Sequence, residues 1–209
     1  FNLIKQLSRR HEVHLLSFIR SEEDLPWVDE LRKYCRGVEI VIAPKHRMWR
    51  RLAAFFFSPL PDMAVRLPSA EFQARLEAYL ERENFDVVQV EGIEMAPYAL
   101  AIKGYGLAAT FLTGLGLYAS GVTFPALARC KVVFDDHNAE YVLQQRAFET
   151  DRRYPGKWLK AVYSLVQYHK LRRYEATVCH AADHVVAVSD TDCVALQGIA
   201  PGVKVTVVP

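Results

Sequence analysis

The sequence predicts an α/β fold with a doubly wound, Rossmann-like parallel sheet, because short apolar strands alternate with helical segments along the whole chain. Two predicted strands run directly into polar residues and then into a helix. The first, from residue 131, ends in Asp135-Asp136-His137-Asn138, and the second, 183–190, ends in Ser189-Asp190. An open parallel sheet has its ligand crevice at the carboxyl ends of its strands. We therefore expect the functional side chains at these polar strand ends.

The other elements follow from hydrophobic periodicity and from breaker residues. An amphipathic helix opens the chain at Phe1. Further strands are predicted at 12–18, 38–43, 85–90 and 203–208. Helices are predicted at 22–36, with Gly37 as its stop, at 69–83, starting from Ser69-Ala70-Glu71, and at 157–180, with Trp158, Val162, Leu165 and His169 as inward-facing candidates.

Composition limits the class of protein. Apolar residues make up 51% of the 209 residues and charged residues 24%, so the chain can bury a sizeable core. The net charge of +2 argues against a dedicated nucleic-acid binder, for which a strongly basic domain is expected. The four cysteines, Cys35, Cys130, Cys179 and Cys193, have no Cys-x-x-Cys spacing, and we expect them to be core thiols of a cytoplasmic protein. No signal peptide is visible.

Five segments, in this order, resemble the amino-terminal half of a family 4 retaining glycosyltransferase of the GT-B fold. They are RRHEVHLLSF (9–18), FDVVQVEG (85–92), VVFDDHNAEY (132–141), ADHVVAVSDTD (182–192) and VKVTVVP (203–209). The resemblance spans nearly the whole chain and rests on the order and spacing of the segments. It implies that residues 1–209 form an acceptor-binding domain truncated at both ends. Members of the family have a first strand with a glycine-rich loop before this region and a donor-binding domain with paired glutamates after it.

The function implied by the resemblance is transfer of a sugar, with retention, from a nucleotide-sugar donor to a glycan or lipid-linked acceptor. Envelope or exopolysaccharide synthesis is the expected setting, the nucleotide-sugar is a substrate rather than a cofactor, and the 209 residues alone are expected to be inactive. Two alternatives remain open. One is a nucleotide-sugar epimerase of the same fold, and the other is a non-catalytic, doubly wound ligand-binding module.

Each candidate site residue also has a structural alternative. The resemblance implies that His137 faces the transferred sugar, where an imidazole can donate a hydrogen bond or move a proton; it could instead fill the turn. Glu91 could accept hydrogen bonds from acceptor hydroxyls, and Gly92 would allow close approach of a ligand. Asn138 and Ser189 are further candidate ligand contacts, but both also suit helix capping, which we favour.

Asp135 and Asp136 raise the question of a metal site. Adjacent residues at a strand end point to opposite faces, so the two carboxylates rarely share an ion. The resemblance also implies a fold that is generally metal-independent. We therefore expect no metal here and interpret both acids as solvated or helix-start residues.

Two segments bear on membranes. Residues 45–57 combine basic side chains with Trp49 and three phenylalanines, a composition typical of an interfacial helix, although an ordinary helix is the alternative. This segment would place the protein at the inner face of the plasma membrane. Residues 104–128 contain no charge, but six breaker residues argue against a membrane span. We interpret 104–129 as an insertion.

Other chemistries lack their motifs. The sequence contains no Gly-x-Ser-x-Gly nucleophile elbow and no Gly-x-x-x-x-Gly-Lys phosphate loop.

Overall fold

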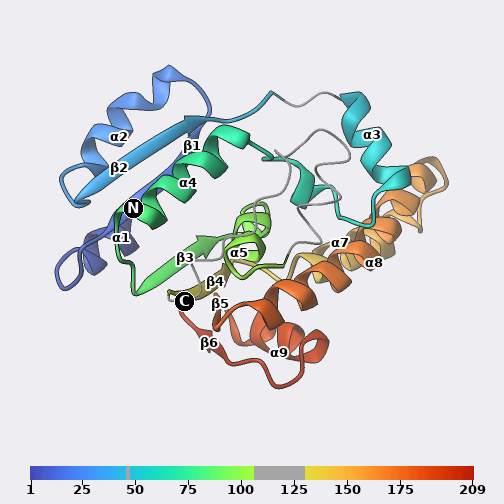
Figure 1. The fold of residues 1–209 in the computed structure, drawn as a ribbon. Helices are drawn as coiled ribbons and strands as arrows, with labels where there is room; N and C mark the ends of the chain where they lie inside the picture. Colours follow the sequence, from blue (N-terminus) through green and yellow to red (C-terminus); the bar gives the residue numbers. More distant parts are fainter. Residues whose placement is uncertain (46–47, 106–129) are drawn as a thin grey trace. The chain divides into compact units, whose positions relative to one another are not determined.

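A computed structural model describes residues 1–45, 48–105 and 130–209, and only the backbone of 48–51. The chain divides into two compact units, whose elements are labelled in Figure 1. Unit 1 contains residues 1–45 and 69–82, and unit 2 contains the other described residues. The paired strands are all parallel, which confirms an α/β fold with parallel sheets. The described strands do not form the single sheet that the sequence predicted. They form a two-stranded sheet, β1-β2, and a four-stranded sheet, β3-β4-β5-β6.

Unit 1 is built on β1 (His14–Ile19) and β2 (Gly37–Ile42), which pair in register from His14↔Gly37 to Ile19↔Ile42. Helix α1 (Asn2–Leu7) precedes them, and a short 3₁₀ turn and α2 (Leu25–Leu31) connect them. The predicted helix 22–36 is therefore too long, and Gly37 begins β2 instead of ending a helix. The hydroxyl of Tyr79 lies 2.7 Å from where a Cβ of residue 37 would stand and Nδ1 of His14 lies 2.9 Å from it, so a larger residue there would force these side chains to shift.

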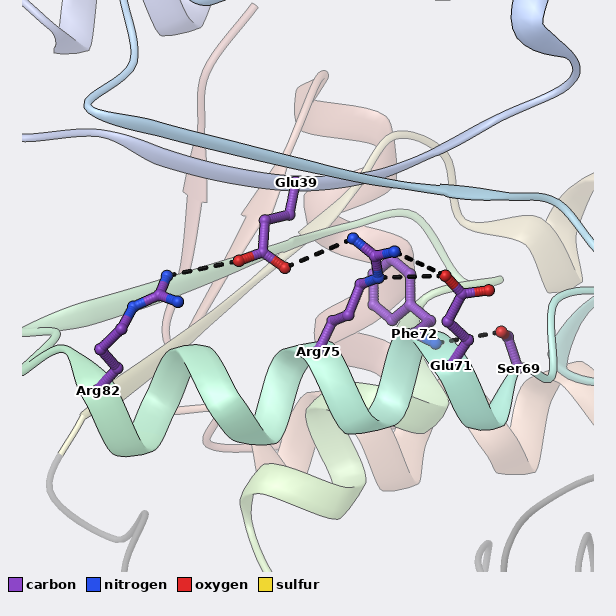
Figure 2. A network of polar contacts seen from close by, with 6 residues as sticks. All are labelled: Glu39, Ser69, Glu71, Phe72, Arg75 and Arg82. Carbon is purple, nitrogen blue, oxygen red and sulfur yellow. Dashed lines mark hydrogen bonds and ion pairs between the residues drawn. The ribbon is translucent and has the colours of Figure 1, made fainter.

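Helix α4 (Ala70–Arg82) packs on β2 within unit 1 and confirms the predicted helix 69–83. The Ser69 hydroxyl accepts a hydrogen bond from the backbone N–H of Phe72 at 3.1 Å, which satisfies a free donor of the first turn. Figure 2 shows that Glu39, on β2, lies between Arg75 and Arg82, at 3.8 Å and 3.4 Å. These contacts bind one face of α4 to the strand beside it.

Unit 2 contains the four-stranded sheet and the helices that carry its core. The strands are β3 (Val87–Glu91), β4 (Lys131–Asp136), β5 (His184–Ala187) and β6 (Val205–Val207). The helices are α3 (Met48–Phe57), α5 (Ala96–Ile102), α7 (Glu140–Asp151), α8 (Trp158–Ala181) and α9 (Asp190–Ile199), with 3₁₀ turns at Met63–Val65 and Pro155–Lys157. Phe134 and Val185, from the two central strands, are fully buried against Leu171 and Leu196.

Helix α8 confirms the predicted bounds but not the predicted inward face. Its buried side begins with Ala161, Ser164 and Gln167, whereas Trp158 is 61% exposed and Val162 is also exposed. Leu165 is half-buried and His169 is exposed. Both sides of the first turns are apolar in sequence, so periodicity alone could not select the side that packs.

The remaining predictions have mixed outcomes. Cys35, Cys130 and Cys179 are buried free thiols and Cys193 is half-buried, as expected of core cysteines. The proposed insertion 104–129 lies outside the described residues from residue 106 onward. Within the described part of the chain, every helix is too short or too polar to cross a bilayer.

Candidate functional site

The ends of β3 and β4 bring two predicted site residues into direct contact. Glu91 and Asp135 are register partners on these parallel strands, and His137 follows Asp135 by two residues. The Nε2 atom of His137 lies 2.9 Å from Oε2 of Glu91. About half of each side chain is exposed, 54% for His137 and 49% for Glu91. The two side chains therefore form a hydrogen-bonded pair that a ligand can reach from solvent.

Gln89 joins the Glu91 carboxylate to that of Asp135. Its amide Nε2 donates to Oε1 of Glu91 at 2.8 Å and to Oδ2 of Asp135 at 3.1 Å. Side chains two residues apart on a strand share a face, which places Gln89 and Glu91 together on β3, and Asp135 and His137 together at the end of β4. Four polar side chains from two strands thus converge at one edge of the sheet. We refer to them below as the rim cluster: Gln89, Glu91, Asp135 and His137.

Asp135 is the buried member of the rim cluster. Only 8% of the residue is exposed, and its Oδ1 atom has no hydrogen-bond partner among the described residues. Burial raises the pKa of the Asp135 carboxyl, and the negative charge of Glu91 raises it further, while His137 and the amide of Gln89 act in the opposite direction. The expectation that this acid is solvated is therefore wrong. Its carboxylate faces another carboxylate across a parallel pair, an arrangement that is unfavourable without a compensating group.

Gly92 occupies the turn beside the rim cluster. Its φ of +79° lies in the left-handed region, where a side chain costs about 1–2 kcal/mol. Its backbone N–H donates to the carbonyl of Asp135 at 2.8 Å, which ties the turn to β4. A Cβ at residue 92 would stand 3.9 Å from Nδ1 of His137. An oxygen of Glu94, Oε2, would stand 3.5 Å from the same Cβ, so the structure explains the glycine by backbone conformation rather than by a clash.

Asp136 points into a second, buried acidic cluster on the other side of β4, formed with Glu175 of α8 and Asp192 of α9. Asp136 is 1% exposed and Glu175 is fully buried. Burial is the largest cause of the raised pKa of both groups. Repulsion from Glu175 raises the pKa of Asp136 further, and the pKa of Glu175 rises to about 8, where repulsion from Glu140 and Asp192 adds to burial and the two backbone N–H bonds act in the opposite direction. The adjacent acids thus face opposite ways, as expected, but the expectation that Asp136 is solvated is wrong.

The buried acidic cluster holds the start of α7. The carboxylate of Glu175 accepts the backbone N–H of Glu140 at 2.7 Å and of Tyr141 at 3.1 Å, and Asp192 accepts that of Ala139 at 3.1 Å. Helix α7 has Ala139 at its N-cap, with no side-chain bond from that residue. The expected capping by Asn138 is therefore wrong, because buried Glu175 and half-buried Asp192, from two other helices, satisfy the free donors instead. Asn138 is exposed beside His137.

Ser189 is the N-cap of α9, as expected. Its hydroxyl accepts the backbone N–H of Asp192 at 3.2 Å and donates to the Asp192 carboxylate. The same carboxylate binds the turn after β4, so the ends of β4 and β5 are connected through Asp192. A contact between Ser189 and a ligand stays a prediction.

Sequence reasoning identified Glu91, Gly92 and His137 but missed Gln89, Glu175 and Asp192. The alternation of side chains along β3 was the available signal for Gln89, since it places residue 89 on the face of residue 91. No local signal marks Glu175, because it lies in the middle of a long helix and far in sequence from the donors that it binds.

The rim cluster has the groups needed to bind a polyhydroxylated ligand and to move a proton. A carboxylate accepts from hydroxyls, and an imidazole either donates or accepts near neutral pH. Comparisons with protein-family models, with curated proteins and with solved structures find no match.

Proposed function

We propose that this chain supplies the acceptor-side wall of a retaining glycosyltransferase, in which His137 and Glu91 bind hydroxyls of the sugar substrates. The observation that carries the proposal is the exposed His137–Glu91 pair, 2.9 Å apart, at the adjacent carboxyl ends of two parallel strands. Ligands of open parallel sheets bind at these ends. The resemblance described above supplies the reaction class, a nucleotide-sugar as donor and a glycan or lipid-linked acceptor.

In this proposal Glu91 orients the imidazole. Its Oε2 atom binds Nε2 of His137, while Gln89 holds its other oxygen, so the ring is oriented with its other nitrogen, Nδ1, 3.9 Å from where a Cβ of residue 92 would stand. A hydroxyl bound there would accept a hydrogen bond from the ring or donate one to it, depending on the tautomer. The expected contribution is orientation and charge compensation around the transferred sugar.

The order of the strands within each sheet is compatible with this fold. In the common doubly wound sheet the strand order is 3-2-1-4-5-6. From strand 1 toward one edge the strands are 1, 2 and 3, and toward the other edge they are 4, 5 and 6, so each half of the sheet follows the order of the chain. The strands of unit 1, β1-β2, and those of unit 2, β3-β4-β5-β6, also lie in chain order, and all their pairs are parallel. This agreement supports the fold that the proposed function requires.

The test replaces His137 by Ala and Glu91 by Gln in a full-length enzyme that contains the donor-binding domain. The control is His184→Ala, since His184 also bonds a neighbouring side chain on the sheet, the Thr206 hydroxyl at 2.7 Å. A positioned proton-transfer group contributes about 10²–10⁴-fold to rate. We expect His137→Ala to lower kcat by on the order of 10²-fold and His184→Ala to leave it unchanged. Wild-type turnover in folded His137→Ala would refute the role.

Product analysis separates the proposal from its alternatives. With donor and acceptor together, a transferase yields a glycoside with the donor's anomeric configuration. An epimerase converts the nucleotide-sugar without acceptor, and a binding module converts neither. Screening nucleotide-sugars against the full-length enzyme therefore decides between the three classes.

We also propose that α3 and the start of α8 bind a membrane surface. Phe55 stacks on Tyr163 with ring centroids 5.5 Å apart, and Lys170 donates to the carbonyl of Phe55 at 2.7 Å, so the two helices are in contact. Several apolar residues of these two segments face solvent. They are Leu52, Phe56, Phe57, Trp158, Leu159 and Val162, with Phe57 79% exposed.

Basic residues accompany this apolar surface. Lys157 and Lys160 are exposed at the start of α8, and Arg50 and Arg51 lie in the first turns of α3. Apolar side chains beside basic ones are typical of proteins that bind anionic bilayers, and the inner face of a plasma membrane is the location that this proposal implies.

Vesicle co-sedimentation tests the membrane proposal. Phe56→Ser combined with Phe57→Ser, and separately Trp158→Ser, should reduce binding to phosphatidylserine-containing vesicles several-fold. The matched control is Trp27→Ser in unit 1, which removes another exposed tryptophan, and it should bind as the wild type does. Equal binding by all four proteins would contradict the proposal.

A further inference from the structure

We propose that the rim cluster is a binding site for one divalent transition-metal ion, with Glu91, Asp135 and His137 as ligands. The inference concerns the same edge of the sheet as the proposed function but does not depend on sugar transfer. It also revises the expectation that this chain holds no metal, which considered only the adjacent pair Asp135 and Asp136. The residues that converge are instead Glu91 on β3 and, two residues apart, Asp135 and His137 at the end of β4.

The first argument is the donor set. One ring nitrogen and two carboxylate oxygens, one from each residue, lie within 4.8 Å of one another. Ligand atoms bound at about 2.0–2.2 Å to one ion are roughly 3–3.5 Å apart, so closing the site requires the exposed side chains of Glu91 and His137 to move toward the buried Asp135. Glu91 and His137 are half exposed and already 2.9 Å apart. A mixture of imidazole and carboxylate suits Zn²⁺ and Mn²⁺.

The second argument is the unpartnered oxygen of Asp135. The residue is more than nine-tenths buried, and Oδ1 has no hydrogen-bond partner among the described residues. A buried polar atom without a partner costs about 1–3 kcal/mol and needs an explanation. Glu91 adds a like charge directly across the strand pair. A bound cation would satisfy the oxygen and neutralise both carboxylates at once.

The third argument is Gln89, which holds one oxygen of each carboxylate. Ligands of metal sites are commonly held by a second group that fixes their orientation. Gln89 binds Oε1 of Glu91 and Oδ2 of Asp135, and this leaves Oε2 and Oδ1 for another partner. Oε2 is the atom that contacts His137, and Oδ1 is the unpartnered atom.

Three protein ligands leave at least one coordination position for solvent or substrate. Hydroxyl or phosphate oxygens are the ligand class that such an ion would bind. In the metal-bound state Nε2 of His137, the nitrogen that faces Glu91, would bind the ion, and Nδ1 would stay available to a hydroxyl.

The experiment titrates the purified chain with Mn²⁺ and then with Zn²⁺, by calorimetry at neutral pH. Mn²⁺ is used first because it prefers oxygen and nitrogen to the cysteine thiols. We expect one ion per chain and at least tenfold weaker binding in His137→Ala, Glu91→Ala and Asp135→Asn. His184→Ala is the matched histidine control and should bind as the wild type does. Circular dichroism establishes that each variant is folded.

Substitution with Co²⁺ gives a second readout, because its visible spectrum depends on the ligand set. Loss of one imidazole in His137→Ala should change the spectrum, whereas His184→Ala should not. The absence of stoichiometric binding, or binding that is equal in wild type and in folded Glu91→Ala and His137→Ala, would overturn the proposal and leave an adventitious ion only.

The two proposals for this edge can fail separately. If the chain binds no ion and the full-length His137→Ala enzyme loses turnover in the presence of EDTA, the metal site is wrong and the proposed function stands. If the chain binds one ion through His137 but the same variant retains wild-type transfer, the proposed function is wrong and the metal site stands.

Discussion

Replacing Glu175 by Gln should change how the stability of unit 2 depends on pH. The side chain is fully buried, accepts two backbone N–H bonds at the start of α7, and has a pKa of about 8 against 4.5 for an unburied glutamate. Because the pKa is raised in the folded state, the stabilisation is complete below about 4.5 and is lost as the pH rises through 8. The amide introduced by Glu175→Gln does not titrate, so the part of this loss that comes from Glu175 should be absent from the variant, while Asp136, whose pKa is also raised, still contributes.

The expected difference in the free energy of unfolding between wild type and Glu175→Gln has two contributions. At pH 5 the protonated carboxyl of Glu175 keeps acceptor capacity on both oxygens, whereas the amide of the variant accepts on one oxygen only, so one of the bonds from Glu140 and Tyr141 is lost at a cost of about 1–3 kcal/mol. Between pH 5 and pH 8 the titration of Glu175 lowers the stability of the wild type by up to about 1.4 kcal/mol per pH unit, and the variant lacks this contribution. The wild type should therefore be the more stable protein at pH 5, and its advantage should shrink or reverse by pH 9.

Urea unfolding at pH 5, 7 and 9 gives the free energy of unfolding, and hydrogen exchange of the amides of Glu140 and Tyr141 gives the local stability of α7. The control is Glu149→Gln, which changes a half-buried glutamate of α7 that accepts a hydrogen bond from the Gln145 side chain. The free energy of unfolding of Glu149→Gln should change with pH as that of the wild type does. A stability difference between wild type and Glu175→Gln that is constant from pH 5 to pH 9 would refute the reasoning.

Two further substitutions test the turn at Gly92 and the ion pairs of Asp183. Gly92→Ala places a side chain at φ +79° and should lower the free energy of unfolding by about 1–2 kcal/mol. The control, Gly156→Ala, has no positive φ and no atom within 4 Å of the new Cβ, and should change the free energy of unfolding by less than about 0.5 kcal/mol. Equal effects of the two substitutions in urea unfolding would contradict this prediction. Asp183 accepts the backbone N–H of Val132 at 2.8 Å and forms ion pairs with Lys103 and Lys131. These groups lower the pKa of Asp183 to about 2. The stability that Asp183 contributes is therefore present above about pH 4 and is lost as the pH falls toward 2. Asp183→Asn should cost about 1–2 kcal/mol at pH 7 and flatten the acid limb of thermal denaturation; an unchanged acid limb would count against it.

The local pattern of this chain predicts its elements well and their packing less well. All six strands were expected within two or three residues of their bounds, because short β-rich runs with helices between them are a local signal. The arrangement of strands into two sheets depends on which strands pair, and that is not a local property. The exposed side of α8 at Trp158 and Val162 was missed for a related reason, since both sides of the helix are apolar there and only the neighbouring helices decide which is covered.

The candidate site shows the same division. Glu91 and His137 were found because they follow strands, but the contact between them required the parallel register of β3 and β4. Glu175 could not be found, since a glutamate inside a 24-residue helix is ordinarily a solvated residue. Its role becomes visible only where the helix crosses the start of α7, some 35 residues away in sequence.

The end of β4 explains why two adjacent acids are present in the chain. Asp135 points to the face that carries Glu91 and His137, and Asp136 points to the face that carries Glu175, as the alternation of a strand requires. Each carboxylate therefore meets another carboxylate, one at the edge of the sheet and one in the core. In the core, burial raises the pKa of Glu175 and repulsion from Glu140 and Asp192 raises it further, so this carboxyl is neutralised by holding a proton. At the edge, where solvent has access, the metal ion that we propose would neutralise Asp135 and Glu91 instead, and this difference is why we propose the ligand site at the edge and not in the core.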